Sequence, residues 1–325
     1  MRLTLHIEEW AAKIPFRITG LTREAFRLVV VELAEGGHVG RGEGMPVHYL
    51  NESADSLYQQ IESLAPHLER GIDRIDLLQL MPAGGARKAV DCALWDLEAK
   101  RSGKSIWELT GIVPRPLTTT FTIGIEKSPE AMAARAREAA CYPILKIKVD
   151  ADHPVERVAA VRAVRPDARL VVDANQGWTF EQLRQIAPQL ARLDVTLIEQ
   201  PLPRGADEEL EGYLSPIPLC ADESCQHRGE LERASRRYQI INIKLDKAGG
   251  LTEALLLAHA VKDAGLEVLA SNMCGTSLSM APTFVLAQLC RYVEIDGHLL
   301  LKYDRVPHLE CQKGVITSLD PRLWG

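Results

Sequence analysis

The spacing of hydrophobic residues over the first 115 positions predicts a mixed α+β unit. Apolar and polar residues alternate over Leu3–Trp10 and Arg27–Leu33, and this spacing is typical of strands. The turn Glu35-Gly36-Gly37 leads into His38–Glu43, which predicts a hairpin. Apolar residues then follow helical spacing over Glu52–Leu68 and Ala86–Arg101.

From residue 116 onward, short β-branched or leucine-rich runs alternate with helical stretches. Eight such runs in one chain, separated mainly by helices, predict a parallel sheet closed into a (β/α)8-type barrel. The runs are Thr118–Ile123, Leu145–Val149, Leu170–Asp173, Thr196–Glu199, Leu219–Asp222, Ile240–Lys244, Glu267–Ala270 and Tyr292–Ile295.

The segment Val113-Pro114-Arg115-Pro116 predicts the junction between these two parts, because two prolines prevent a helix from continuing. We therefore expect an α+β capping domain at residues 1–115 and a barrel at residues 116–299. The tail, from about residue 300 to 325, is expected to return to the capping domain.

Composition and charge narrow the range of partners. The chain has 325 residues and a net charge of −6, and its basic residues form no long run. This argues against a nucleic-acid partner and against a polybasic membrane anchor. No apolar stretch approaches the roughly 18 residues of a membrane span, and no signal sequence is evident. Seven cysteines without CxxC spacing indicate reduced thiols, so we predict a cytoplasmic protein.

Three consecutive predicted strands end in a carboxylate: Asp173, Glu199 and Asp222. Barrel enzymes carry their chemistry at the carboxyl ends of their strands, so these side chains are expected to meet in one mouth. Their mutual repulsion would be relieved by a hard divalent cation, which predicts a Mg²⁺ site. The alternative is that each carboxylate caps the helix that follows it.

Lysines end the strands on both sides of these carboxylates, at Lys146 and Lys148 on one side and Lys244 on the other. Like charge and a nearby metal would lower the pKa of a lysine toward the range of a general base. Two such bases beside a metal suit the removal of a proton alpha to a carboxylate. The metal would stabilise the enediolate, and the second lysine would return a proton on the opposite face.

The chain resembles the muconate-lactonising-enzyme subgroup of the enolase superfamily over essentially its whole length. The segments that carry the resemblance are Ala-Leu-Trp-Asp-Leu-Glu-Ala-Lys (93–100), Trp-Glu-Leu-Thr-Gly (107–111), Lys-Ile-Lys (146–148), Asp-Ala-Asn (173–175), Ile-Glu-Gln-Pro (198–201), Ala-Asp-Glu-Ser (221–224) and Asn-Ile-Lys-Leu-Asp-Lys-Ala-Gly-Gly (242–250). The resemblance implies an α/β fold, in which a (β/α)7β TIM-like barrel is covered by an α+β capping domain.

The resemblance also implies roles for individual residues. Lys148 and Lys244 would be the two bases, and Lys146 would tune Lys148. The Mg²⁺ ligands, for one ion per subunit, would be Asp173, Glu199 and Asp222. Asn175 and Glu223 would lie beside the ligands.

Within the subgroup, the chain is most similar to the bacterial L-Ala-D/L-Glu epimerases, which act on dipeptides. Their eighth strand carries an Asp-x-Asp pair that binds the ammonium group of the dipeptide. The corresponding residues here are Glu294 and Asp296, and the glutamate is one methylene longer. Arg23, in an expected mobile loop at Ile18–Phe26, would pair with an acidic substrate side chain or lie free in solvent. A second lid segment is expected at Met45–Glu52.

The sequence therefore predicts a Mg²⁺-dependent isomerase that epimerises dipeptides by two-lysine 1,1-proton transfer. An N-acyl-amino-acid racemase or an o-succinylbenzoate synthase remains the alternative, although substrates of these enzymes would leave Glu294 and Asp296 without a cation. A non-catalytic relative is disfavoured, because no ligand or lysine is missing. The expected partner is a small dipeptide, and the sequence leaves open whether the chain forms a homo-oligomer.

Overall fold

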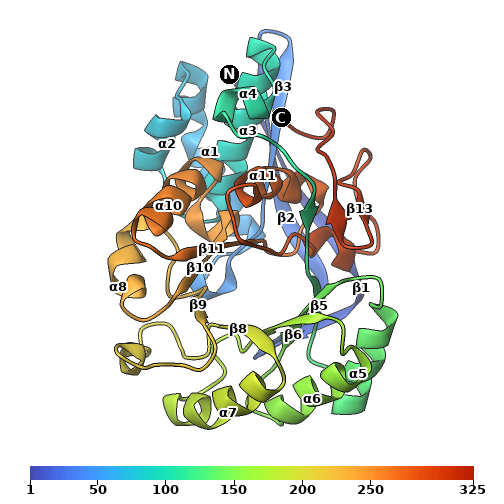
Figure 1. The fold of residues 1–325 in the computed structure, drawn as a ribbon. Coiled ribbons are helices and arrows are strands. Elements are labelled where there is room, and N and C mark those ends of the chain that lie inside the picture. The colour runs from blue at the N-terminus through green and yellow to red at the C-terminus, as the bar shows by residue number, and fades with distance from the viewer.

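The computed structural model describes all 325 residues (Figure 1). An antiparallel sheet of β1 (Arg2–Ile18), β2 (Leu21–Glu35) and β3 (His38–Gly44) opens the chain. Four helices follow it: α1 (Ala54–Arg70), α2 (Arg74–Leu80), α3 (Gly85–Ser102) and α4 (Ile106–Thr110). This N-terminal part, the cap, lies against one end of the barrel.

The core of the cap forms between the sheet and helices α1 and α3. Alternate residues of β2, such as Val29 and Val31, face Leu57 and Ile61 of α1 in one apolar cluster. The glycines of β3 let α3 approach the strand closely. A Cβ atom added at Gly42 would lie 2.0 Å from the carbonyl oxygen of Ala89, so a side chain at this position would separate strand and helix.

The segment predicted as a loop at Ile18–Phe26 is instead the tip of a long hairpin. Strands β1 and β2 pair almost to their ends, with Phe16 opposite Arg23 and Ile18 opposite Leu21. Only Thr19 and Gly20 form the turn. The loop prediction failed because the pairing is sustained by contacts with the barrel, which local spacing does not reveal. In the second lid segment, His48–Leu50 form a 3-10 helix, η1.

All eight runs predicted as barrel strands form one parallel sheet. In chain order they are β5 (Phe121–Ile123), β6 (Ile144–Lys148), β7 (Arg169–Asp173), β8 (Val195–Glu199), β9 (Leu219–Ala221), β10 (Ile240–Lys244), β11 (Glu267–Ser271) and β12 (Tyr292–Val293). The first and last strands meet where the Thr120 N–H donates to the Val293 carbonyl oxygen at 3.2 Å. The fold is thus the enolase-like barrel and cap that the sequence predicted.

Helices surround most of the barrel. They are α5 (Pro129–Glu138), α6 (Pro154–Val164), α7 (Phe180–Arg192), α8 (Leu231–Ser235), α9 (Leu245–Ala248), α10 (Leu251–Asp263) and α11 (Ser277–Ala287). The connection between β8 and β9 contains only the 3-10 turn Glu208–Leu210, η2. Two further 3-10 turns are η3 (Arg228–Glu230) and η4 (Gly297–Leu300). No helix is both long and apolar enough to cross a lipid bilayer.

The last part of the chain returns to the cap. Strands β13 (Cys311–Gln312) and β14 (Val315–Ile316) form a small sheet with β4 (Leu117–Thr118). Beyond it, the fully buried Trp324 donates its indole N–H to the carbonyl oxygen of Cys92 in α3 at 2.9 Å. The division at residues 115 and 116 stays a prediction, although this contact is what a tail that completes the cap should make.

A buried ion pair fastens the cap to the barrel. Lys88 of α3 donates to both carboxylate oxygens of Asp246, which follows β10, at 3.0 Å. Both side chains are about 1% exposed. Asp246 also accepts the backbone N–H of Met45 at 2.8 Å, so the same carboxylate positions the lid segment.

We predict that Lys88→Met lowers the free energy of unfolding by roughly 3–5 kcal/mol, because it leaves the Asp246 carboxylate buried without its cation. Urea denaturation would measure this change. Arg27→Met is the matched control, since the Arg27–Asp55 pair is exposed and its loss should change stability by less than about 1 kcal/mol. Equal effects of the two substitutions would contradict the prediction.

Candidate functional site

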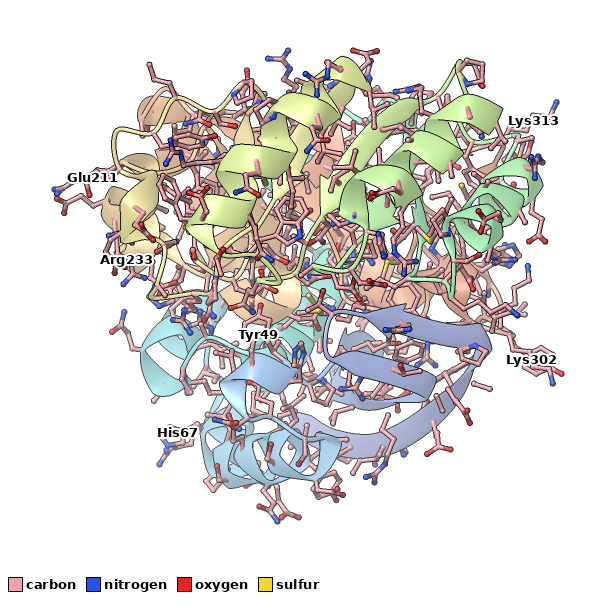
Figure 2. All side chains as sticks on the ribbon, turned by 90° about the horizontal axis from the view of Figure 1, so that it is seen from below. Tyr49, His67, Glu211, Arg233, Lys302 and Lys313 are labelled. Atoms are coloured by element: carbon pink, nitrogen blue, oxygen red, sulfur yellow. The ribbon has the colours of Figure 1, made fainter.

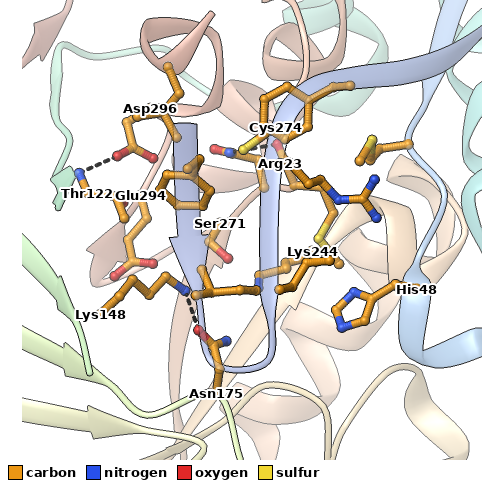
Figure 3. A pocket seen from close by; sticks show the side chains of 18 of the residues that line it. Arg23, His48, Thr122, Lys148, Asn175, Lys244, Ser271, Cys274, Glu294 and Asp296 are labelled. Carbon is orange, nitrogen blue, oxygen red and sulfur yellow. Dashed lines mark hydrogen bonds between the residues drawn. The ribbon is translucent and has the colours of Figure 1, made fainter. Parts of the chain in front are cut away.

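A cavity lies where the cap covers the carboxyl ends of the barrel strands (Figure 3). The cap contributes Phe16, Ile18, Leu21, Arg23, Phe26, Met45, Pro46, His48 and Tyr49, and the barrel contributes most of the charged lining. Figure 2 shows Tyr49 where cap and barrel meet, whereas His67 lies on the far side of the cap. The cavity therefore draws its chemistry from the barrel and its outer wall from the cap.

The three strand-end carboxylates come from neighbouring strands. Asp173 ends β7, Glu199 ends β8, and Asp222 follows β9 directly. Asp173 and Glu199 are paired in the register of the two parallel strands. All three side chains are buried, and none is the N-cap of the helix that follows, because α7 begins after Thr179 and α8 after Glu230.

Lys146 is surrounded by carboxylates. Its Nζ lies 2.5 Å from an oxygen of Glu199, 2.7 Å from Glu294 and 3.1 Å from Asp173. The ammonium group therefore uses its hydrogen-bonding capacity on the buried acids around it. With no free donor pointing into the cavity, Lys146 is better placed to organise the site than to move a proton.

Lys148 and Lys244 approach the cavity from opposite sides and point toward one another in Figure 3. Lys148 Nζ lies 2.5 Å from Asp173 Oδ2 and 3.0 Å from Asn175 Oδ1. Lys244 Nζ lies 2.5 Å from Asp222 Oδ2. The structure thus brings together the two lysines, both strand-end aspartates and Asn175, as the sequence placed them.

The acids around Lys244 and Lys146 determine the direction of the pKa shift of each lysine. Burial alone would lower the pKa of Lys244, but the carboxylates of Asp222 and Glu199 outweigh it and raise that pKa. The pKa of Lys146 is raised in the same way by Glu199, Glu294 and Asp173. The sequence argument considered a lysine beside a metal, whereas here the lysines themselves neutralise the acids.

The buried carboxyl groups of the site outnumber its lysines. We call the following set the charge cluster: Asp173, Glu199, Asp222, Glu223, Glu294 and Asp296, with Lys146, Lys148, Lys244 and Lys247. It holds six carboxyl groups and four lysines. Burial, together with the charge of Asp173, raises the pKa of Glu199 to about 8. Burial and Asp222 raise the pKa of Glu223 to about 7.

This excess of acid is what a divalent cation would neutralise. Three buried oxygens of the cluster, Asp222 Oδ1, Glu223 Oε2 and Glu294 Oε1, accept no hydrogen bond, although Lys247 Nζ is 2.9 Å from the first. No three His, Cys, Asp or Glu side chains are arranged as a metal site in the protein alone. Because lysine ammonium groups contact the acids, a cation would have to displace them. The donor set suits Mg²⁺ by charge and ligand type.

The acidic pair after β12 lies on the cavity wall. Asp296 Oδ2 accepts the Thr122 backbone N–H at 2.6 Å, and Asp296 lines the cavity. Glu294 directs one oxygen to Lys146 and keeps the other, Oε1, buried without a partner. Both acids therefore line the cavity, and of the two only Glu294 contacts Lys146.

Arg23 projects from β2 into the cavity and makes no hydrogen bond or ion pair with another residue (Figure 3). His48, from η1, lies near it in the same view. Burial, followed by the positive charges of Arg23 and Lys244, lowers the pKa of His48, so this ring is held neutral. The outer end of the cavity thus presents an unpaired cation.

Gln200 and Lys247 support the site and were not recognised as site residues in the sequence. Gln200 Oε1 accepts the backbone N–H groups of Asp222 and Ser224, each at 3.0 Å. Gln200 has a left-handed backbone with φ of 35°, which is rare for this residue type. Lys247 donates to the carbonyl oxygens of Asp222 and Cys225. Both residues lie within the sequence motifs 198–201 and 242–250, but only the geometry of the turns shows which backbone groups they contact.

The comparisons with known proteins agree with this site. Residues 1–111 match the N-terminal domain of the mandelate racemase / muconate lactonizing enzyme family, and residues 130–317 match the enolase C-terminal domain-like family. Together these matches cover most of the chain. It therefore belongs to the enolase superfamily, in the branch of mandelate racemase and muconate lactonizing enzyme.

Two relatives narrow the class further. The chain is 41% identical to the L-Ala-D/L-Glu epimerase of Escherichia coli K12, over 94% of this chain and 96% of that protein. It is 38% identical to the N-acetyl-D-glutamate racemase of a Pseudoalteromonas species, over 92% and 95% of the two chains. Both relatives are isomerases that act on amino acid derivatives.

Solved structures of similar proteins contain ligands. An enolase family member from Agrobacterium tumefaciens, with bound sodium and L-Ala-L-Glu, superposes with a TM-score of 0.96, at 41% identity over 99% of both chains. The dipeptide epimerase of Enterococcus faecalis V583, in complex with Mg and L-Leu-L-Tyr, gives a TM-score of 0.89, at 26% identity over 97% and 96%. Magnesium is therefore found in structures of this family.

We predict that Glu199→Gln and Asp222→Asn each weaken Mg²⁺ binding by roughly tenfold or more, because a hard cation depends on its charged oxygen ligands. Isothermal titration calorimetry with Mg²⁺ would measure this. The exposed Glu211→Gln should bind as the wild type does. Unchanged affinity in both site variants would rule these residues out as ligands.

A second prediction concerns Gln200. Replacing it with alanine removes the acceptor of two buried N–H groups and should lower the free energy of unfolding by roughly 2–5 kcal/mol. Thermal and urea denaturation would test this, with the exposed Gln189→Ala as the control. A loss no larger than that of the control would show that the turn holds its shape without Gln200.

Proposed function

We propose that this chain is a Mg²⁺-dependent epimerase of dipeptides of the L-Ala-Glu type. The observation that carries the proposal is the placement of Lys148 and Lys244 on opposite sides of one buried cavity. An α-carbon held between two such amines can lose its proton on one face and receive a proton on the other. The configuration at that carbon is then inverted.

Each lysine would act in both directions of the reaction. Lys148 would remove the α-proton of one epimer, and Lys244 would deliver a proton from the other side. In the reverse direction the roles exchange. Lys148 and Lys244 contact Asp173 and Asp222 at 2.5 Å, and these contacts would give way when the carboxylates bind Mg²⁺. Asn175 adds a second contact to Lys148 at 3.0 Å.

Asp173, Glu199 and Asp222 would hold one Mg²⁺ per subunit, with Glu223 beside them. When bound, the ion would supply positive charge that stabilises the negative charge developing on the substrate carboxylate. The excess of buried acid in the charge cluster supports this assignment. Loss of lysine contacts to the carboxylates on metal binding would also free the amines for proton transfer.

The substrate preference follows from the charges at the two ends of the cavity. Asp296, with a carboxylate on the cavity wall, would accept the ammonium group of the dipeptide, and Glu294 would add negative charge behind it. Arg23, unpaired at the opposite wall, would bind the side-chain carboxylate of the glutamyl residue. A guanidinium suits this role because it can bind a carboxylate through two parallel hydrogen bonds.

A second candidate is an N-acetylglutamate racemase, and the 38% identity to the Pseudoalteromonas enzyme favours it. Its substrate has the same acylated glutamate but no ammonium group. The metal site, the lysines and Arg23 would serve both substrates equally. Only the acidic pair Glu294 and Asp296 distinguishes them, and it favours the dipeptide.

Seven unpaired cysteines suit a reducing compartment, so we place the enzyme in the cytoplasm.

The test is exchange of the α-proton in deuterated water, followed by proton NMR. We expect deuterium in the glutamyl α-position of L-Ala-L-Glu, together with formation of L-Ala-D-Glu. Incorporation only into N-acetyl-L-glutamate would select the second candidate. Incorporation into neither substrate would refute both.

Lys148→Ala and Lys244→Ala should each abolish epimerisation, while each variant keeps exchange with at most one of the two epimers. This asymmetry is expected because each epimer presents its proton to a different lysine. Lys302→Ala, in the exposed tail, is the control. Wild-type epimerisation by either site variant would exclude the two-base arrangement.

A further inference from the structure

The tip of the β1–β2 hairpin contacts the barrel through the side chain of Thr19. Thr19, at the turn, directs its hydroxyl to the carbonyl oxygen of Ala174 at 3.0 Å and to that of Val149 at 3.3 Å. These carbonyls follow β7 and β6, directly after Asp173 and Lys148. A single hydroxyl proton is thus shared between two strand ends at the rim of the site.

The barrel surface under the tip is shaped to receive it. A Cβ atom at Gly177 would lie 3.3 Å from both the Oγ1 and the Cγ2 of Thr19, which is closer than side chains usually approach. One strand away, the Ile125 N–H donates to the Arg17 carbonyl oxygen at 2.9 Å. The Arg17–Asp150 ion pair, with 3.7 Å between nitrogen and oxygen, adds little to the attachment of the tip because the Arg17 side chain is half exposed.

Arg23 is coupled to this attachment through the hairpin ladder. It pairs with Phe16 across the two strands, and the turn at Thr19 is only four residues away along the chain. Arg23 has no hydrogen bond or ion pair of its own to hold it over the cavity. Its position therefore depends on where the hairpin tip rests, which is set by Thr19 and by the Ile125 contact.

We propose that Thr19 is a positioning residue for substrate specificity: its hydroxyl fixes the hairpin tip on the barrel rim and thereby holds Arg23 in reach of an acidic substrate side chain. The inference rests on the proposed function, because it assigns Arg23 to that side chain. Thr19 itself is not among the residues that line the cavity, so it would act through Arg23.

The experiment compares L-Ala-L-Glu with L-Ala-L-Gln, which has nearly the same shape but lacks the negative charge. For Thr19→Val, we expect kcat/KM for L-Ala-L-Glu to fall about tenfold, mainly through KM, while the value for L-Ala-L-Gln changes less than about twofold. Thr19→Ser keeps the hydroxyl and should restore the discrimination. Equal losses on both dipeptides would overturn the proposal and indicate a general structural role.

A double-mutant cycle with Arg23→Gln tests the coupling directly. If Thr19 acts through Arg23, adding Thr19→Val to Arg23→Gln should cause little further loss on L-Ala-L-Glu. Independent, multiplicative losses would contradict the mechanism even if the single variants behaved as expected. Should the wild type process only N-acetylglutamate, the same comparison is made with N-acetylglutamate and N-acetylglutamine. In that case the proposed dipeptide epimerase activity is refuted, but the comparison of the two N-acetyl compounds still tests the role of Thr19.

Hydrogen exchange gives a readout that needs no turnover. Thr19→Val should speed exchange of the Ile125 amide, whose partner is the Arg17 carbonyl, by about tenfold or more. Thr19→Ser should leave the rate near that of the wild type. An unchanged rate in Thr19→Val would overturn the proposal, whatever substrate the enzyme takes.

Discussion

The site depends on a surplus of buried carboxyl groups over buried lysines. Six carboxyl groups and four lysines share the mouth of the barrel, and almost none of their surface reaches solvent. Burying ions is unfavourable unless each has a partner, so the cluster holds together only because lysines and acids are interleaved. The remaining excess of acid favours binding of a cation. The same interleaving places Lys148 and Lys244 against different aspartates, on opposite sides of the space where a substrate would lie.

The fold supplies this arrangement through two separate devices. Parallel strands bring Asp173, Glu199 and Asp222 to one edge, because the carboxyl ends of the strands all point the same way. The turns after those strands are then fixed by side chains such as Gln200 and Lys247, which satisfy backbone groups. The cap adds a wall that carries few charges apart from Arg23. Chemistry and selectivity are thus borne by different parts of the chain.

Much of this was predictable from the sequence because it depends on local spacing. The eight barrel strands, the strand-end acids and the lysines all lie in short, regular runs. The hairpin tip at Thr19 and the inward turn of Glu294 were not predictable, since each is decided by a partner far away in the chain, Ala174 for one and Lys146 for the other.

The return of the tail to the cap bears on how the protein is made. Trp324 is buried beside α3 and donates a hydrogen bond to the carbonyl oxygen of Cys92, more than two hundred residues earlier in the chain. Arg41 of β3 donates to the carbonyl oxygen of Leu323. During synthesis, the cap emerges first but lacks this partner until the barrel has been translated. An incomplete chain would therefore leave part of α3 uncovered. The packing of the cap around α3 is therefore completed only after residues 323 and 324 have been translated.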